Sequence, residues 1–349
     1  MNRTGAIGFA AIALLLTAGT PHMASVRADP LAPRPISSAI YAGSASGHIY
    51  RSATGTSHWQ ESDHGVPAGS DITALAVTPN GGTVYAATWG SGLYVSADGG
   101  MHWRNAGGPH TNLGVNYISG LALDPEHSQT VYAVTSDDRF HVGTDAGAHW
   151  DSTLLPVDLI DSVTTTSLSV SRNDPALMLV GTELEGIVRS SDVGRTWSDT
   201  NLSTNLSVNA LTFSPRSANV AYAATDKGIY QTVDSGISWQ LERHGIAAGT
   251  QFQAIAVDPG NAALVLAGTP DGQFYRSRDG GTSWAFQGRT DGSQINVVLF
   301  DPAHAGVVLA GTNDGGTIYR SDDNGGHWTG YATGFDAADD ILSLAASSR

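Results

Sequence analysis

Seven near-copies of one octamer, each ending in tryptophan, constrain the fold of this 349-residue chain more than any other feature. The clearest copy reads SADGGMHW over residues 96–103, and five copies keep a Ser or Thr, an Asp, a Gly and a Trp at the same places. The successive tryptophans are 44, 47, 47, 42, 45 and 44 residues apart. A period in the low forties is typical of propellers whose blades have four strands each, so the repeat predicts such a ring.

Each period can be divided into four strands by its apolar segments. In the second period these segments are ITALAVTP at 72–79, TVYAAT at 83–88 and GLYVS at 92–96, and the fourth strand starts at Trp103. The first segment is apolar on both faces, as expected for a strand buried on both sides. Helical periodicity is absent throughout, which predicts an all-β protein.

Strand counting predicts how the ring closes. No first strand precedes Ser38, but ILSLAAS at 341–347 follows Trp328 at the interval that separates Trp59 from the next first strand. The C-terminal strand should therefore pair with residues 38–61, because closure removes exposed sheet edges. The predicted fold is one domain over residues 38–349, a seven-bladed β-propeller of four-stranded antiparallel blades.

The first 28 residues differ in kind from the repeats. Arg3 precedes an apolar run at 6–19, and small residues stand three and one positions before Asp29. This pattern indicates a secretory signal peptide over residues 1–28 and a secreted or extracytoplasmic protein, with an uncleaved anchor as the alternative. Residues 29–37 are predicted to be a proline-rich leader, and no later segment is apolar enough to span a membrane.

Charge and composition narrow the classes of function. The formal net charge is −15, Lys227 is the single lysine, and cysteine is absent. A surface this acidic repels nucleic-acid backbones, so no nucleic-acid partner is predicted. Without cysteine there is no disulfide, thiolate zinc site or cysteine nucleophile. We predict no cofactor and no metal, and we expect a monomer.

The octamer has the composition of a tight turn between the third and fourth strands. An Asp can accept hydrogen bonds from backbone N–H groups of its own loop, Gly permits a positive φ, and Trp can bury its ring between blades. The structural residues predicted in this way are Asp98, Asp145, Asp192, Asp234, Asp279, Asp323, Trp59, Trp103, Trp150, Trp197, Trp239, Trp284 and Trp328. The copy at 143–150 has Gly143 at the Ser position, and the first copy lacks the Asp and the Gly.

These octamers resemble the Asp-box, or BNR repeat, of sialidases, family 74 xyloglucanases, sortilin-type receptors and photosystem II stability and assembly factors. The resemblance implies a propeller whose sites lie on the face opposite the boxes. The assembly factors are most similar in architecture, as single exported propellers that bind protein partners. This resemblance implies an exported, non-catalytic binding module.

The loops expected on that opposite face are mostly acidic. Those joining second to third strands carry Trp89, Asp137, Asp138, Arg139, Glu183, Glu185, Asp226, Lys227, Asp271 and Asp314. The residues leading into first strands, expected at the rim of the central channel, are Asp71, Asn116, Gln251, Gln294 and Asp340. Three interpretations stay open: solvated turn residues, a calcium or other cation site, and a paired-carboxylate glycosidase centre.

The enzyme hypothesis can be compared with family motifs. The sialidase pattern is not matched, because Arg51, Arg189, Arg276 and Arg320 directly precede octamers and are expected at the surface. Family 74 xyloglucanases place a catalytic Asp after a Thr, an offset that Glu183 and Asp226 occupy here. Those enzymes cleave between two tandem propellers, whereas this chain has one. The alternative function is a glycoside hydrolase acting on a polysaccharide through Glu183 and Asp226. Sugars stack on aromatic rings, and the sequence offers only Trp89, Tyr117 and Tyr331 near that face, which favours the binding module.

Overall fold

The computed structural model describes residues 38–348 except 54–55, 108–112, 114–116, 157–163, 203–204, 314, 332–333 and 337–338. The predicted signal peptide and leader lie outside the described residues. The chain divides into two units, Met1–Arg34 and Pro35–Arg349, and the second unit carries the fold. No helix in the described part of the chain is long and apolar enough to cross a bilayer.

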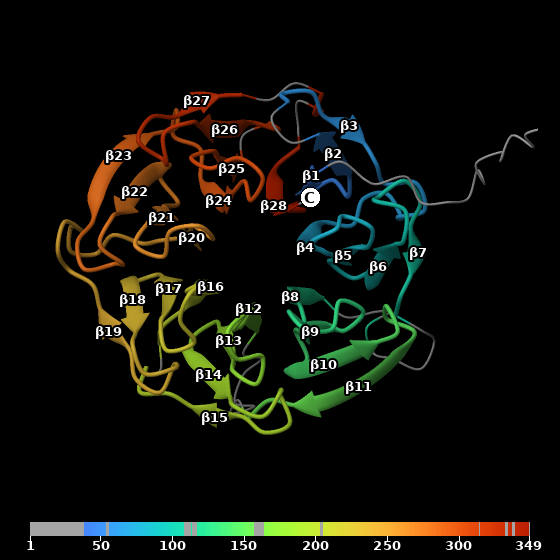
Figure 1. The fold of residues 1–349 in the computed structure, drawn as a ribbon, viewed down its shortest axis with the longest axis horizontal. Helices are drawn as coiled ribbons and strands as arrows, with labels where there is room; N and C mark the ends of the chain where they lie inside the picture. Colours follow the sequence, from blue (N-terminus) through green and yellow to red (C-terminus); the bar gives the residue numbers. More distant parts are fainter. Residues whose placement is uncertain are drawn as a thin grey trace, which may run out of the picture. The chain divides into compact units, whose positions relative to one another are not determined.

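Seven four-stranded antiparallel sheets form a ring, as the repeat predicted (Figure 1). The first, innermost strands are β4 (Ile72–Val77), β8 (Ile118–Leu123), β12 (Thr165–Val170), β16 (Val208–Phe213), β20 (Ala254–Val257), β24 (Ile295–Phe300) and β28 (Ile341–Ala346). The second strands are β1 (Ala39–Ser44), β5 (Val84–Thr88), β9 (Val131–Thr135), β13 (Met178–Thr182), β17 (Ala221–Thr225), β21 (Val265–Gly268) and β25 (Val308–Thr312).

The two outer strands of each blade complete the sheets. The third strands are β2 (Ile49–Ala53), β6 (Leu93–Ser96), β10 (Arg139–Thr144), β14 (Ile187–Ser190), β18 (Gly228–Thr232), β22 (Gln273–Ser277) and β26 (Ile318–Ser321). The fourth strands are β3 (Gln60–Glu61), β7 (Arg104–Asn105), β11 (His149–Leu154), β15 (Ser198–Asp199), β19 (Gln240–Leu241), β23 (Ala285–Arg289) and β27 (Thr329–Gly330).

The core lies between neighbouring blades. Every residue of the seven second strands is buried, because each of these strands has a sheet neighbour on both edges and a blade on both faces. Glycine permits close approaches here: a Cβ on Gly43 would lie 2.4 Å from Cγ2 of Ile72, and one on Gly268 would lie 2.4 Å from Cγ2 of Ile295. The second strand of one blade thus contacts the start of the next blade's inner strand without space for a side chain.

The ring closes as the strand count predicted. β28 pairs with β1, and the register joins Ile40 to Ala346 and Ala42 to Leu344. The hydroxyl of Ser343 donates to the carbonyl of Ile72 in the next blade at 3.0 Å. The closing blade therefore has the strand order β28-β1-β2-β3, with its inner strand taken from the C-terminal part of the chain.

The octamers form the turns between third and fourth strands. In the copy at 232–239, Asp234 Oδ1 accepts from the Ser238 N–H at 2.8 Å and from the Thr232 hydroxyl at 2.8 Å, and Oδ2 accepts from the Ser238 hydroxyl at 2.6 Å. The Trp239 indole N–H donates to the Gly236 carbonyl at 3.2 Å. The predicted hairpin is confirmed, and the Asp holds it closed through three hydrogen bonds.

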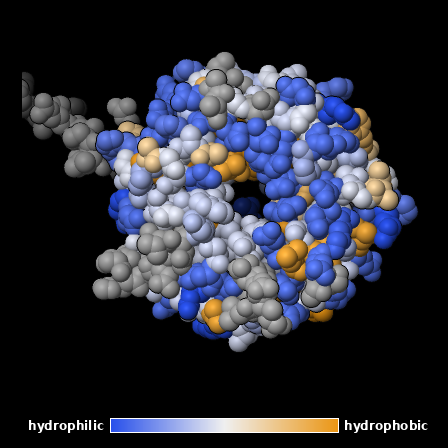
Figure 2. Space-filling model, turned by 180° about the vertical axis from the view of Figure 1, so that it is seen from behind, coloured by the Kyte–Doolittle hydropathy of each residue, from blue (hydrophilic) through white to orange (hydrophobic). Residues whose placement is uncertain are grey.

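Two faces of the ring follow from the strand directions. The octamer turns bond to the turns between first and second strands, as in Gly99 N–H to Gly82 O at 3.3 Å, so both kinds of turn lie on one side, the octamer face. The loops between second and third strands, such as 89–92 and 183–186, and the connections from fourth to first strands form the loop face. In Figure 2 the ring opens at its centre, and hydrophilic residues predominate on the side shown.

Candidate binding face

The β9–β10 loop contributes the most buried carboxylate of the predicted set. Asp138 has a positive φ of 58° and is only 5% exposed, and its Oδ1 is buried without a partner among the described residues. Burial, together with the charge of Asp137, raises the pKa of Asp138. Asp137 accepts from the Thr135 hydroxyl at 2.5 Å and forms an ion pair with Arg139 at 3.4 Å. These three charged residues lie together, and Asp138 among them has a buried oxygen, Oδ1, without a hydrogen-bond partner among the described residues.

Glu183 and Asp226, the predicted catalytic pair, follow the second strands of neighbouring blades. The Glu183 side chain is exposed, whereas Asp226 is half-buried. Asp226 Oδ1 accepts from the backbone N–H of Ser207 at 3.1 Å. One carboxylate is therefore engaged in holding the connection into β16, and the other lies in solvent.

The remaining charged loop residues are partly engaged in their own turns. Glu185 is half-buried, and the exposed Lys227 donates through Nζ to the carbonyl of Asn205. Asp271 accepts from the Thr269 hydroxyl at 2.6 Å and from the Gln273 amide at 2.5 Å. These bonds, the Thr269 hydroxyl first, lower the pKa of Asp271.

The residues predicted at the channel rim occupy the connections into first strands. Asp71 is half-buried and its carbonyl accepts from the Trp89 N–H at 2.9 Å, while Gln251 is exposed. The Gln294 amide donates to Asn296 at 2.8 Å, and the half-buried Asp340 accepts through its carbonyl from Ala45 N–H at 2.9 Å. Asn116 and Asp314 lie outside the described residues.

An exposed aromatic pair is the main apolar feature of the loop face. The rings of Trp89 and Tyr117 stack at 4.3 Å between centroids with an interplanar angle of 26°. The residues form an antiparallel bridge between neighbouring blades, yet they stay 51% and 42% exposed. Gly90, with a φ of 88°, lies against the Tyr117 ring, where an added Cβ would approach it to 3.3 Å. The pair thus presents a stacked aromatic surface to solvent.

Tyr331, the third predicted aromatic residue, has a different setting. Its hydroxyl accepts from Arg320 at 2.7 Å, and the Arg320 guanidinium lies 4.7 Å from the Tyr331 ring centroid. Both side chains border a hollow together with residues 56–58 of the first octamer. Tyr331 therefore joins Arg320 beside an octamer turn rather than the stacked pair.

A histidine with surrounding carboxylates was missed by sequence reasoning. His48 Nδ1 lies 2.9 Å from Asp63 Oδ2 and 3.2 Å from Glu61 Oε1, and it also groups with Asp336 and Asp339. Asp339 is 1% exposed and accepts from the Tyr50 hydroxyl at 2.5 Å. The donor set would suit a divalent cation. The β2–β3 hairpin brings Glu61 and Asp63 to His48. Asp336 and Asp339 reach it only through ring closure, so the sequence carried a weak signal for the full group.

We expect a His48→Gln substitution to destabilise the protein more at pH 5.5 than at pH 8.5. Burial lowers the pKa of His48, but the hydrogen bond to Asp63 and the charges of Asp339, Asp63 and Glu61 outweigh it and raise the pKa above 6.5. The protonated form thus favours the folded state below that value, and the contribution is lost as pH rises through the folded-state pKa.

Urea unfolding of wild type and variant at the two pH values measures this difference. The His48 side chain is partly exposed, so the additional loss of unfolding free energy at pH 5.5 is expected to be below about 1 kcal/mol. An equal effect of the substitution at both pH values would show that the carboxylates around His48 do not stabilise its charged form.

Comparison with known proteins identifies the fold. The model of the DUF6242 beta propeller domain family matches residues 39–294, and no curated protein matches the chain. Among solved structures, the GH74 xyloglucanase from Xanthomonas campestris has a TM-score of 0.69 at 19% identity, covering 84% of this chain and 52% of that one. The chain thus spans about half the length of that enzyme.

In a second kind of solved structure, the match extends over most of this chain and most of the other protein. YCF48 from Cyanidioschyzon merolae has a TM-score of 0.54 at 16% identity, over 75% of this chain and 84% of that one. YCF48 bound to D1 peptide has a TM-score of 0.55 at 15% identity, over 74% and 81%. At these identities the similarities show the fold alone, and they confirm the predicted resemblance to single propellers and to family 74 enzymes at that level.

Proposed function

Since the chain belongs to the DUF6242 β-propeller family, whose description states a fold, we propose from its loop face that it is an exported, non-catalytic binding protein. The partner is a protein segment that contacts the stacked pair Trp89 and Tyr117. This exposed pair is the observation that carries the proposal. Aromatic residues, Trp above all, dominate binding energy at protein interfaces, and two rings already stacked on each other have less side-chain freedom to lose on binding.

Charge indicates which kind of segment would bind. The loop face carries Glu183, Glu185, Asp137 and Asp271, and the whole chain has a net charge of −15. A partner segment with basic residues next to an apolar or aromatic side chain would complement both features. The structure of YCF48 bound to D1 peptide supports this proposal by analogy, since a similar propeller there holds a peptide.

The alternative is a glycoside hydrolase, favoured by the fold similarity to the GH74 xyloglucanase. Hydrolysis requires one protonated acid and one ionised partner at a defined separation. A general acid that stays protonated at neutral pH is usually buried. Glu183 is exposed and Asp226 bonds to the Ser207 N–H, which supports the non-catalytic proposal.

The binding proposal predicts that Trp89→Ala and Tyr117→Ala weaken partner capture about tenfold or more, the effect of removing an interface anchor. Immobilised wild type and variants would be incubated with the extracytoplasmic fraction of the source cells, and retained proteins quantified by mass spectrometry. Phe286→Ala is the matched control, because Phe286 is also 51% exposed but lies on the outer strand β23. Equal retention by all variants would contradict a role for the aromatic pair.

The enzyme alternative is tested separately. Purified protein is expected to release no sugar from xyloglucan, β-glucan or sialylated substrates. If it does hydrolyse one of them, and Glu183→Gln or Asp226→Asn abolishes the activity without lowering the melting temperature, the hydrolase takes the place of the binding protein.

A further inference from the structure

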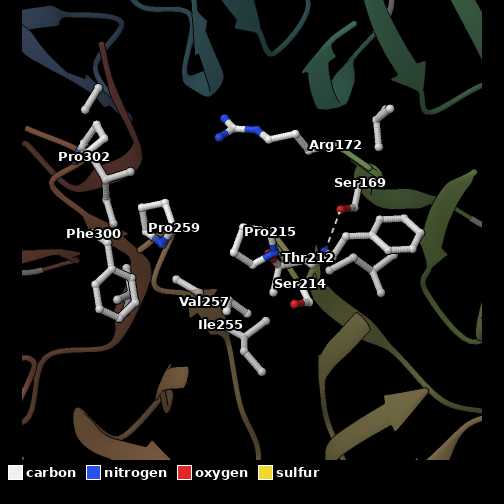
Figure 3. A pocket seen from close by; sticks show the side chains of 17 residues that line it. Ser169, Arg172, Thr212, Ser214, Pro215, Ile255, Val257, Pro259, Phe300 and Pro302 are labelled. Carbon is white, nitrogen blue, oxygen red and sulfur yellow. Dashed lines mark hydrogen bonds between the residues drawn. The ribbon is translucent and has the colours of Figure 1, made fainter. Parts of the chain in front are cut away.

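The octamer face holds a hollow at the mouth of the central channel. Two cavities of about 390 Å³ and 660 Å³ share Arg172, Pro259 and Pro302 in their walls, and Figure 3 shows the side chains that line the smaller one. Pockets for small organic molecules usually have volumes of 300–1,000 Å³, so this hollow is large enough for one. It lies across the ring from the loop face and is independent of the function proposed above.

A ring of prolines forms the rim of the hollow. The residue two positions after each first strand lies here, and in five blades that residue is proline: Pro79, Pro125, Pro215, Pro259 and Pro302. The closing blade has Ser348 instead, and the blade of β12 has Arg172. We call this cavity the proline hollow. Because proline has no backbone N–H, five of these positions offer no hydrogen-bond donor to a ligand.

Arg172 differs from the prolines because it places a charged hydrogen-bond donor at the equivalent position. Its side chain points into the hollow from the end of β12 (Figure 3). It makes no hydrogen bond or ion pair with any residue that the structure describes, and it is exposed. A guanidinium offers five donors in a planar fork that fits a carboxylate through two parallel hydrogen bonds. The side chain is therefore free to bind an anion.

The remaining walls combine apolar side chains of the inner strands with polar groups such as Thr212 and Ser214. Ile255, Val257 and Phe300 line the smaller cavity, and Leu75 and Leu121 line the larger. The Ser169 hydroxyl accepts from the Phe213 N–H at 3.2 Å and so is engaged (Figure 3). The apolar side chains in these walls favour an apolar body on the ligand.

Glu126, on the neighbouring turn, restricts the charge of the ligand. It lines the larger cavity together with Arg172, so a second negative charge on a ligand would meet a carboxylate. The net charge of −15 also disfavours polyanions. We propose that the proline hollow binds a small organic acid with one carboxylate on an apolar body, and that Arg172 binds the carboxylate.

Titration calorimetry with octanoate tests this site. Wild type is expected to bind octanoate at least about tenfold more tightly than Arg172→Gln, because a charge-assisted pair is lost. Arg195→Gln, which removes an exposed arginine from the octamer turn of the same blade, is the matched control and should bind like wild type. Arg172→Pro introduces the residue of five equivalent turns and serves as a second variant without the charge.

Two further ligands separate the parts of the proposal. Octanol keeps the apolar body and lacks the charge, so it should bind wild type at least about tenfold more weakly than octanoate and should not distinguish wild type from Arg172→Gln. Acetate keeps the single carboxylate and lacks most of the apolar body, and it too should bind more weakly than octanoate. The site assignment is wrong if octanoate does not bind, if both charge-removing variants bind it like wild type, or if octanol or acetate binds as tightly.

Discussion

Removal of residues 338–349 is expected to abolish cooperative folding of the propeller. The deletion takes away β28, which pairs with β1 and contacts the inner strands of both neighbouring blades. Ile341 and Leu344 are 0% and 8% exposed, and burial of two such side chains contributes about 3–6 kcal/mol. This loss is comparable to the whole stability of a typical domain, about 5–15 kcal/mol, even before the lost strand pairing is counted.

The truncated protein should elute as aggregates in size-exclusion chromatography, because β1 then exposes an unpaired edge beside the channel. A shorter deletion of residues 348–349 leaves β28 intact and is the control. A monomeric truncated protein with the melting temperature of wild type would contradict the closure of the ring by β28.

The Asp234→Ala substitution is expected to lower the free energy of unfolding by about 1–3 kcal/mol. It removes the acceptor of three hydrogen bonds and leaves the Ser238 N–H without its partner. Urea unfolding at neutral pH measures the effect. Ligand affinity at the loop face should not change, because the turn lies on the octamer face.

The chain contains its own control for this experiment. Asp145 occupies the equivalent place in the copy at 143–150, but its φ is 52°, it is mostly exposed, and its side chain contacts the exposed His149 at 3.1 Å. Asp145→Ala should therefore destabilise by less than about 1 kcal/mol, in the range of an exposed pair. Equal losses for the two substitutions would show that the hydrogen bonds of Asp234 do not set the stability of its turn.

At acid pH, the difference in the free energy of unfolding between wild type and Asp234→Ala should become smaller. The Ser238 hydroxyl, followed by the Ser238 backbone N–H, holds the pKa of Asp234 below its usual 3.8. A lowered pKa means that the stabilisation is present above 3.8 and is lost as pH falls through the lower, folded-state value. Unfolding curves recorded between pH 5 and pH 2 would follow this loss.

Local sequence patterns were sufficient to predict the fold. The segment at 72–79 contains β4 (Ile72–Val77), and ILSLAAS at 341–347 contains β28 (Ile341–Ala346). Both segments are apolar on two faces because inner strands lie between blades, and the octamer marks each hairpin directly. Such signals depend on neighbours within one repeat, so they need no knowledge of how distant repeats meet.

Part of the candidate sites could not be predicted, because they depend on how distant repeats meet in the ring. His48 meets Asp339 only because residues from opposite ends of the repeat array share the closing blade. Arg172 stands two positions after a first strand, and only the ring shows that the seven equivalent positions, six in turns and one in the C-terminal segment, converge on one hollow. The sequence predicted sites on the loop face alone, so the proline hollow on the octamer face was not predicted.

The seam between β1 and β28 has a consequence for the order of folding. The Ala39 N–H bonds to the Ser347 hydroxyl across 308 residues, whereas other blades form within one repeat. Closing a loop of that length costs about 5 kcal/mol of chain entropy, against about 3.4 kcal/mol for 45 residues. The thermodynamic difference is small, but contacts this distant form slowly. Six blades should therefore assemble first as an open arc, and the seam between β1 and β28 should form last. Until it forms, the unpaired edges of the arc can pair with other chains, so the lifetime of the arc determines the risk of misassembly.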